Sequence, residues 1–163
     1  MSERTWDRFV LLFLRLAMGW IFLREAAHLF GDPRWSTADI FRQSVTFNGL
    51  FAWFIGPSMT PFMDFLARWA YLFVGASYLT GFALRASEPV GVAILAITWA
   101  TRLDFPYVGG RESVVIDHNV VYAIIVIFLV VKRAGLVWGL DAIVARNPGI
   151  RNNPATRWIF SAE

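Results

Sequence analysis

The sequence NVVYAIIVIFLVV, from Asn119 to Val131, contains thirteen consecutive residues without a charged side chain. It forms the centre of an apolar segment that runs from Ser113 to Val131. Three further apolar segments precede it, at Trp6 to Phe30, Phe62 to Leu84 and Pro89 to about Tyr107. Because each approaches the roughly 20 residues that a helix needs to cross about 30 Å of hydrocarbon, the sequence predicts an all-α, four-transmembrane-helix bundle.

The composition also indicates a membrane-embedded chain. Of the 163 residues, 57% are hydrophobic and only 17% are charged. A soluble domain of this length buries only about two thirds of its surface, too little to cover eight Trp and fifteen Phe. The absence of cysteine excludes a thiol nucleophile and any iron–sulfur cluster held by this chain. The fifteen Lys and Arg residues are dispersed rather than gathered in a stripe, so we expect no nucleic-acid partner.

The connection between the first two apolar segments, Gly31 to Pro61, is long enough to contain structure of its own. Ser36 and Thr37 are candidate N-caps, and the apolar run Phe47 to Ile55 ends at a Gly-Pro pair. We expect an extra interfacial or partly re-entrant helix in this connection.

The distribution of Arg and Lys predicts the orientation in the membrane. With four spans both termini share one side, and that side would carry more basic residues, which makes it cytoplasmic by the positive-inside rule. The predicted location is the cell membrane, with the Gly31 to Pro61 connection outside the cytoplasm. Residues 1–135 form the predicted transmembrane domain, and residues 136–163 form a cytoplasmic interfacial tail.

Two kinds of residue inside the spans predict helix contacts. Small residues such as Gly19, Gly75 and Gly91 mark positions where membrane helices approach one another closely. Arg15 lies in the middle of the first span, where a charged side chain needs a partner, a backbone carbonyl or a water defect.

All four predicted spans place ionisable side chains at their extracytoplasmic ends. The charge-free parts of the third and fourth spans are thirteen residues long, about 20 Å, so ionisable groups must lie below the outer surface. We expect a polar pocket roofed by the Gly31 to Pro61 connection and built from Arg24, Glu25, His28, Asp64, Arg68, Arg102, Asp104, Asp117 and His118. The alternative for each pair is an ordinary ion pair at a helix end.

The residues of this pocket predict its chemistry. Arginine binds small oxyanions through paired hydrogen bonds, and the candidate substrate-binding residues are Arg24, Arg68 and Arg102. Quinone reduction requires proton exchange, and the candidate catalytic residues are Glu25, Asp117 and His118.

A quinone is the expected cofactor, because flat apolar and aromatic walls suit its ring. Trp20 and Trp99 are the candidate cofactor-binding residues, and a place in the aromatic belt or the core is the alternative for both. No zinc motif is present in the sequence, so no metal site is predicted.

Three stretches also resemble the first, second and fourth helices of the DoxX/DoxD family. They are LRLAMGWIFLREAAHLF (Leu14 to Phe30), FLARWAYLFVGASYLTGFALR (Phe65 to Arg85) and DHNVVYAIIVIFLVVKRAGLVWGLD (Asp117 to Asp141). The resemblance implies a four-helix membrane protein. The best-defined family members are large subunits of thiosulfate:quinone oxidoreductase, which implies oxidation of thiosulfate to tetrathionate at the outer face, electron transfer to quinone and a small second subunit.

The leading hypothesis is a membrane oxidoreductase subunit that oxidises a small sulfur oxyanion at the outer face and passes electrons to quinone. The alternative is a non-catalytic anchor or assembly subunit of a larger redox or respiratory complex. Expected partners are the lipid bilayer, quinone, and either a second subunit or further copies of this chain. A small transporter is the least supported hypothesis, because the four segments show neither inverted halves nor broken helices.

Overall fold

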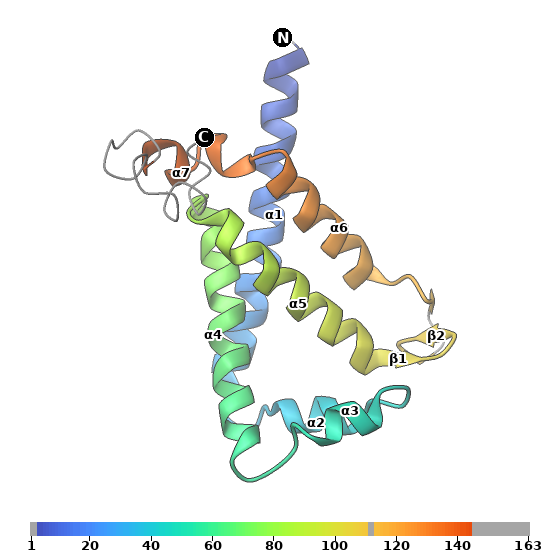
Figure 1. Ribbon diagram of the computed structural model, residues 1–163. Helices are drawn as coiled ribbons and strands as arrows, with labels where there is room; N and C mark the ends of the chain where they lie inside the picture. Colours follow the sequence, from blue (N-terminus) through green and yellow to red (C-terminus); the bar gives the residue numbers. More distant parts are fainter. Residues whose placement is uncertain (1–2, 111–112, 145–163) are drawn as a thin grey trace.

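A computed structural model describes residues 3–110 and 113–144, and the predicted all-α class is confirmed (Figure 1). The long helices are α1 (Glu3–Gly31), α4 (Met59–Thr80), α5 (Leu84–Arg102) and α6 (His118–Val131). The short ones are α2 (Thr37–Arg42), α3 (Asn48–Ala52), α7 (Leu140–Val144) and the 3-10 helix η1 (Ala134–Leu136). A small antiparallel sheet of order β1-β2-β3 joins α5 to α6, with strands β1 (Leu103–Asp104), β2 (Tyr107–Val108) and β3 (Ser113–Val114).

The structure corrects the ends of two predicted spans. The third was predicted to reach Tyr107, whereas α5 ends at Arg102 and the chain continues into β1 and β2. The fourth was predicted to begin at Ser113, whereas α6 begins at His118. The physical reason is an N-cap, because the Asp117 carboxylate accepts hydrogen bonds from two backbone N–H groups of the first turn.

The lengths and charges of the helices bear on the predicted membrane crossings. Helix α6 has 14 residues and extends about 21 Å. Helix α4 carries Asp64 and Arg68 in its first half. No helix within the described residues combines the length with the apolar character that crossing a membrane requires.

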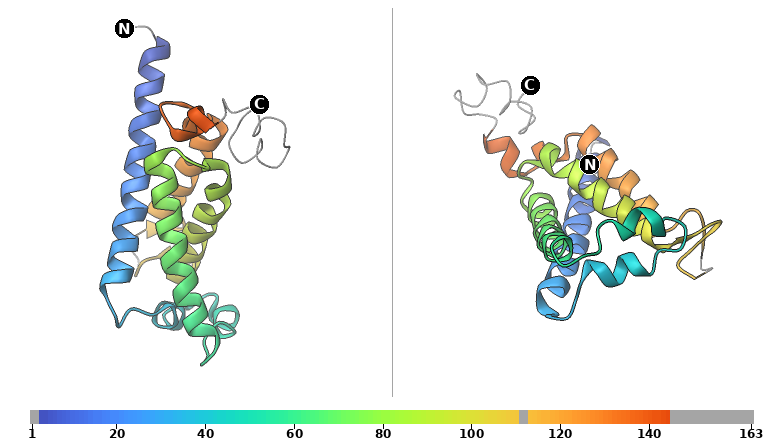
Figure 2. Two further views of the ribbon diagram at one scale, coloured as in Figure 1. Left: turned by 90° about the vertical axis from the view of Figure 1, so that its left-hand side faces the viewer. Right: turned by 60° about the horizontal axis from the view of Figure 1, so that its bottom comes forward.

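Helices α1 and α4 run side by side because glycines at their contact let the two backbones approach (Figure 1, Figure 2). A Cβ atom at Gly19 would lie 2.8 Å from the backbone nitrogen of Leu79. A Cβ atom at Gly75 would lie 2.8 Å from the backbone nitrogen of Leu23. The prediction that Gly19 and Gly75 mark helix contacts is thus confirmed.

Replacing Gly75 by alanine is expected to lower the free energy of unfolding by about 1–3 kcal/mol, because the new methyl group forces α1 and α4 apart. Helix propensity alone predicts the opposite sign, with alanine favoured by roughly 1 kcal/mol. Gly49→Ala in α3 is the matched control, since nothing lies within 4 Å of its Cβ position. Thermal unfolding of both purified variants checks this, and a stabilised Gly75→Ala variant contradicts it.

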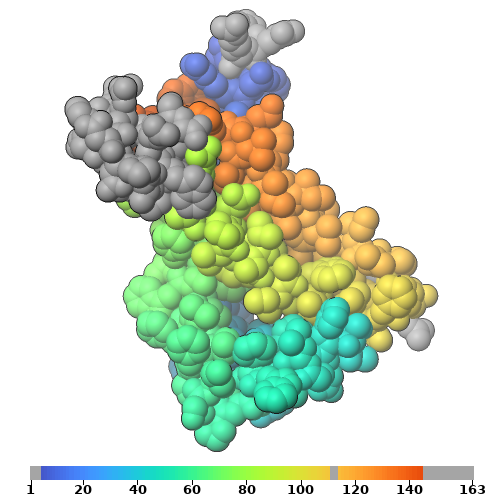
Figure 3. All heavy atoms as spheres, in the orientation of Figure 1, coloured from blue at the N-terminus to red at the C-terminus, as the bar shows by residue number. Residues whose placement is uncertain are grey.

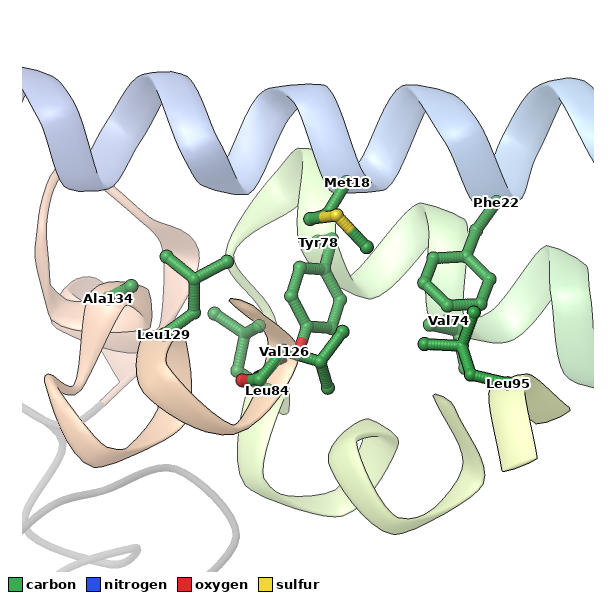
Figure 4. Packing of buried hydrophobic residues seen from close by; sticks show 9 residues of the cluster. All are labelled: Met18, Phe22, Val74, Tyr78, Leu84, Leu95, Val126, Leu129 and Ala134. Carbon is green, nitrogen blue, oxygen red and sulfur yellow. Dashed lines mark hydrogen bonds between the residues drawn. The ribbon is translucent and has the colours of Figure 1, made fainter. Parts of the chain in front are cut away.

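The apolar core lies between the four long helices and is drawn in Figure 4. Met18 and Phe22 of α1 face Val74 and Tyr78 of α4. The buried cluster consists of Met18, Phe22, Val74, Tyr78, Leu84, Leu95, Val126, Leu129 and Ala134. All four long helices contribute to one core, so the bundle is a single packing unit.

Arg15 lies at one end of this core and is only 2% exposed. Its Nη1 atom donates to the carbonyl oxygens of Ala134 at 2.8 Å and Val137 at 2.9 Å. The sequence predicted that Arg15 needs a partner side chain, a backbone carbonyl or a water defect, and the structure shows backbone carbonyls. They tie the middle of α1 to η1 and to the residue that follows it.

Asp141 of α7 is completely buried beside this arginine. Its Oδ1 atom accepts a hydrogen bond of 2.8 Å from the backbone N–H of Ala83, in the turn between α4 and α5. Burial raises the pKa of Asp141 above its ordinary value, although backbone hydrogen bonds and the charge of Arg15 oppose the shift. Of the predicted tail, 136–163, residues 145–163 lie outside the described residues.

The raised pKa of Asp141 predicts a pH dependence of stability. The folded state holds this proton more tightly than the unfolded chain, so the stabilisation is complete below the ordinary pKa of about 3.9 and is lost as pH rises through the raised folded value. Asp141→Asn removes this component. Thermal unfolding of both proteins between about pH 4 and pH 8 checks the prediction, and parallel curves would count against it.

Candidate functional site

A cavity of about 530 Å³ lies between α1, α2, α4 and α5, and we call it the apolar cavity. Figure 3 shows the surface hollowed where α4, α5 and the α2–α3 segment meet. This volume falls within the range of roughly 300–1,000 Å³ that is typical of small-molecule sites. Helix α2 contributes Thr37, Ile40 and Phe41 to the wall, so a helix within the Gly31 to Pro61 connection lies over this cavity, whereas the pocket predicted beneath that connection was polar.

Small side chains form part of the lining of the apolar cavity. Ala67 and Ala70 of α4 and Ala93 of α5 line it from its two long walls. The larger lining residues are Leu29, Ile40, Phe41, Met63, Leu66, Val90, Ile94 and Ile97. These side chains give the cavity the apolar walls that a flat lipophilic ring requires.

A few polar groups interrupt these walls. Glu25 of α1 lines the cavity, and its side chain is 38% exposed. The hydroxyl oxygen of Tyr71 lies 3.4 Å from that of Thr98. Because Thr98 donates its single proton to the Ile94 carbonyl at 2.9 Å, Tyr71 is the donor of this pair. The charge of Glu25 also acts on Tyr71, so Glu25 lies near the pair of hydroxyl groups of Tyr71 and Thr98.

A second, more polar cavity of about 450 Å³ lies between the end of α1, the connection from α1 to α2, and the first half of α4, and we call it the arginine cavity. Its polar lining residues are Arg34, Ser36, Asp64 and Arg68. Its aromatic lining residues are Phe30, Trp35, Phe65 and Trp69. Trp35 is the residue that lines both cavities.

Asp64 anchors the start of α2 rather than facing an unpaired cation. Its Oδ1 atom accepts hydrogen bonds from the backbone N–H of Thr37 at 2.7 Å and from the Thr37 hydroxyl at 2.6 Å. The hydroxyl of Ser36 donates to the same oxygen at 3.3 Å. Ser36 also accepts from the backbone N–H of Ala38, which confirms it as an N-cap.

Arg68 is held against Trp35. Its Nη2 atom donates to the Trp35 carbonyl at 3.2 Å, and its Cζ atom lies 5.7 Å from the centre of the indole ring. The Nε atom of Arg68 is buried and has no hydrogen-bond partner within the described residues. Such an unsatisfied donor costs about 1–3 kcal/mol, so this atom is suited to a ligand.

A third group of polar residues lies where α5 and α6 meet the small sheet. The Nη1 atom of Arg102 lies 3.4 Å from Nε2 of His118, and Nδ1 of His118 lies 3.9 Å from Oδ2 of Asp117. The amide of Asn119 donates to the same Asp117 oxygen at 2.7 Å. The imidazole is half exposed, and none of these side chains lines either of the two cavities.

The remaining predicted site residues lie on the outside of the bundle. The Arg24 side chain is 73% exposed, and His28 and Trp20 are also exposed. The indole N–H of Trp99 donates to the Val115 carbonyl at 2.8 Å. The structure therefore places Asp64 and Arg68 in the lining of one cavity and brings Arg102 to His118, and neither Arg24 nor Arg102 lines the apolar cavity or the arginine cavity.

Sequence reasoning missed three residues of the cavities, Trp35, Tyr71 and Thr98. A signal was present, because Ala67, Ala70 and Tyr71 recur at helical spacing along α4. In the sequence, small residues such as Gly75 predicted helix contacts, whereas Ala67 and Ala70 on this face of α4 line open space.

Comparison with protein-family models, with curated protein sequences and with solved structures gives no match for this chain. The chemistry of the site accordingly rests on the residues that line the two cavities. The resemblance to the DoxX/DoxD family stays a prediction.

Proposed function

We propose that this protein is a membrane oxidoreductase subunit of the DoxX/DoxD type that binds quinone in the apolar cavity. The observation that carries this proposal is the cavity of about 530 Å³ with apolar walls and Glu25 at its edge. A quinone ring is flat and lipophilic and requires few polar partners, which matches this lining. A bound quinone would accept two electrons and two protons.

The residues of the cavity support the proton side of this reaction. Glu25 is partly exposed and lines the cavity, so it connects the interior with the outside and transfers protons toward the bound ring. Tyr71 and Thr98 hold their hydroxyls 3.4 Å apart in the lining of the same cavity and orient the ring through a hydrogen bond. Asp117 and His118 lie at the end of α6, outside the cavity lining, and are assigned no role in this proton transfer.

The outer faces of the long helices support placement in the cell membrane. Large apolar side chains there are exposed, for example Phe13 of α1 at 72% and Val131 of α6 at 71%. Trp20, Phe65 and Ile124 belong to the same outward-facing set. Soluble monomers rarely expose apolar patches larger than a few hundred Å², so lipid is the proposed partner of this surface. The proposed orientation places both termini in the cytoplasm, in accordance with the excess of basic residues on that side.

The proposed reductant is a small sulfur oxyanion such as thiosulfate, by resemblance to the family. Two thiosulfate ions each give up one electron and join through a new S–S bond in tetrathionate. The two electrons and two protons convert one quinone to quinol, so the reaction is balanced. A small second subunit is the proposed partner.

A quinone reduction assay tests the function. We expect the purified protein in lipid nanodiscs to reduce a soluble quinone when thiosulfate is supplied, and Glu25→Gln to lower kcat about 100-fold or more. Asp39→Asn is the matched control, because Asp39 is exposed on α2, pairs with Arg42 and lines neither cavity. Equal activity in both variants would remove Glu25 from the mechanism, and no activity in the wild type would refute catalysis by this chain alone.

One observation favours the second candidate, a non-catalytic anchor or assembly subunit. Of Arg24, Arg68 and Arg102, only Arg68 lines one of the two cavities described above, so these cavities do not bring the three predicted anion ligands together. An anchor would bind its partner in fixed stoichiometry and would carry no quinone. Co-purification followed by extraction and analysis of bound quinone distinguishes the two functions.

A further inference from the structure

We infer that the arginine cavity is a binding site for a tetrahedral oxyanion. Arg34 and Arg68 are its two basic residues, and Asp64 is its one acidic residue. The Oδ1 atom of Asp64 already accepts three hydrogen bonds from Ser36 and Thr37. The hydrogen bonds therefore partly compensate the negative charge of Asp64, and the net charge of the residues that line the cavity is positive.

The unpartnered donor of Arg68 points to the type of ligand. Nε of Arg68 is buried without a partner among the described residues, although Nη2 of the same guanidinium donates to the Trp35 carbonyl. A guanidinium presents its donors in a planar fork that fits two oxygens of one oxyanion. A single carbonyl therefore leaves the fork incomplete, and an oxyanion completes it.

The geometry of Arg68 is fixed before a ligand arrives. The indole ring of Trp35 lies 5.7 Å from Cζ, and the Trp35 carbonyl holds Nη2 at 3.2 Å. Preorganised donors lose less side-chain entropy on binding than flexible ones. Arg34 lies in the same cavity one residue before Trp35 and adds a second positive charge.

This site deepens the proposed function, and its assignment to the donor substrate rests on that function. Trp35 lines both the arginine cavity and the apolar cavity, so an anion in one and a quinone ring in the other would be neighbours. Binding of the anion itself does not depend on the proposed reaction, because it follows from the charges and donors of the cavity.

The oxyanion has two possible sources with the same chemistry. One is a free ion such as thiosulfate or sulfate. The other is the phosphate of a lipid headgroup, because the exposed aromatic residues Phe30, Phe65 and Trp69 line the same cavity and are suited to contact with acyl chains.

Calorimetric titration of the purified protein with sodium thiosulfate and with sodium sulfate tests the free-ion source. Native mass spectrometry from nanodiscs of phosphatidylglycerol or phosphatidylcholine tests the lipid source. We expect Arg68→Gln to weaken binding of the free ion or of the lipid, whichever binds to the wild type, about 10-fold or more. Arg68→Lys is expected to retain only part of the wild-type affinity, because lysine lacks the planar pair of donors of a guanidinium. Arg42→Gln is the matched control, because this exposed arginine of α2 lines neither cavity.

Retention of the free ion with no lipid assigns the site to a soluble anion, and selective retention of phosphatidylglycerol assigns it to a headgroup. Equal affinities for Arg68→Gln and Arg42→Gln, or no binding in both arms, overturn the inference. Thermal unfolding of each variant establishes that it is folded. Thiosulfate binding without quinone reduction supports this oxyanion site but contradicts the proposed function. Quinone reduction that is unaffected by Arg68→Gln supports the proposed function but contradicts this oxyanion site.

Discussion

Replacing Arg15 by methionine is expected to lower the free energy of unfolding by about 3–5 kcal/mol. Its guanidinium is buried and donates to the carbonyls of Ala134 and Val137. Methionine fills similar space but leaves the buried Ala134 carbonyl without a donor, at about 1–3 kcal/mol, and also the partly buried Val137 carbonyl. It also leaves Asp141 without its opposing positive charge. Denaturant-induced or thermal unfolding of the purified variant measures the loss.

A double-mutant cycle supplies the control for this prediction. Asp141→Asn removes the carboxylate that depends on Arg15, so the double variant is expected to lose at least about 0.5 kcal/mol less than the sum of the two single losses. Strictly additive losses would contradict an electrostatic coupling between Arg15 and Asp141. A loss below 1 kcal/mol for Arg15→Met would contradict its structural role altogether.

The second large effect is expected from filling the apolar cavity. Ala93 lines it from α5, and a tryptophan at this position occupies the space that a quinone ring would take. We expect Ala93→Trp to weaken binding of a soluble quinone at least about 100-fold, because a displaced ring loses most of its apolar contact area. Equilibrium dialysis of the quinone against the protein in nanodiscs measures this directly.

Ala76→Trp is the matched control for cavity filling. Ala76 is an exposed residue of α4 and does not line either cavity, so the same large side chain there is expected to leave quinone binding unchanged. Equal loss of binding in both variants would indicate a general effect of tryptophan. Unchanged binding in Ala93→Trp would show that quinone does not bind in the apolar cavity.

The candidate site was only partly predictable from the sequence. The sequence indicated that the Gly31 to Pro61 connection holds a helix over the ends of the bundle, and α2 covers the apolar cavity. It also placed Arg102 with His118, and these side chains meet at 3.4 Å. Arg24 and Arg68, which were predicted to share a pocket, have different surroundings, because the Arg24 side chain is 73% exposed while Arg68 is held by Trp35.

Neighbouring residues show why helix ends are a poor guide to a shared site. Each step along an α-helix turns the chain by about 100°, so two neighbouring residues differ in how much of each side chain faces the bundle, although Nη2 of Arg24 and Oε2 of Glu25 lie 4.0 Å apart. Glu25 lines the apolar cavity, and Arg24 is exposed. The sequence predicted that both lie at the same end of α1, but it did not predict which of them faces the other helices.

The sequence by itself determined the features that depend on local chemistry. Apolar segments indicated four long helices, Ser36 marked the start of α2, and Gly19 and Gly75 marked the contact of α1 with α4. Caps and small-residue contacts act over a few residues or between two helices, so they can be read from short patterns.

Only the tertiary structure decided where the open space lies and which polar groups reach it. The partners of Arg15 are about 120 residues away in the chain, since Ala134 and Val137 reach it only after α6 has returned along the bundle. Trp35 joins two cavities because α2 folds across the ends of α1 and α4. Such contacts depend on the rotation and packing of whole helices, which no short stretch of sequence specifies.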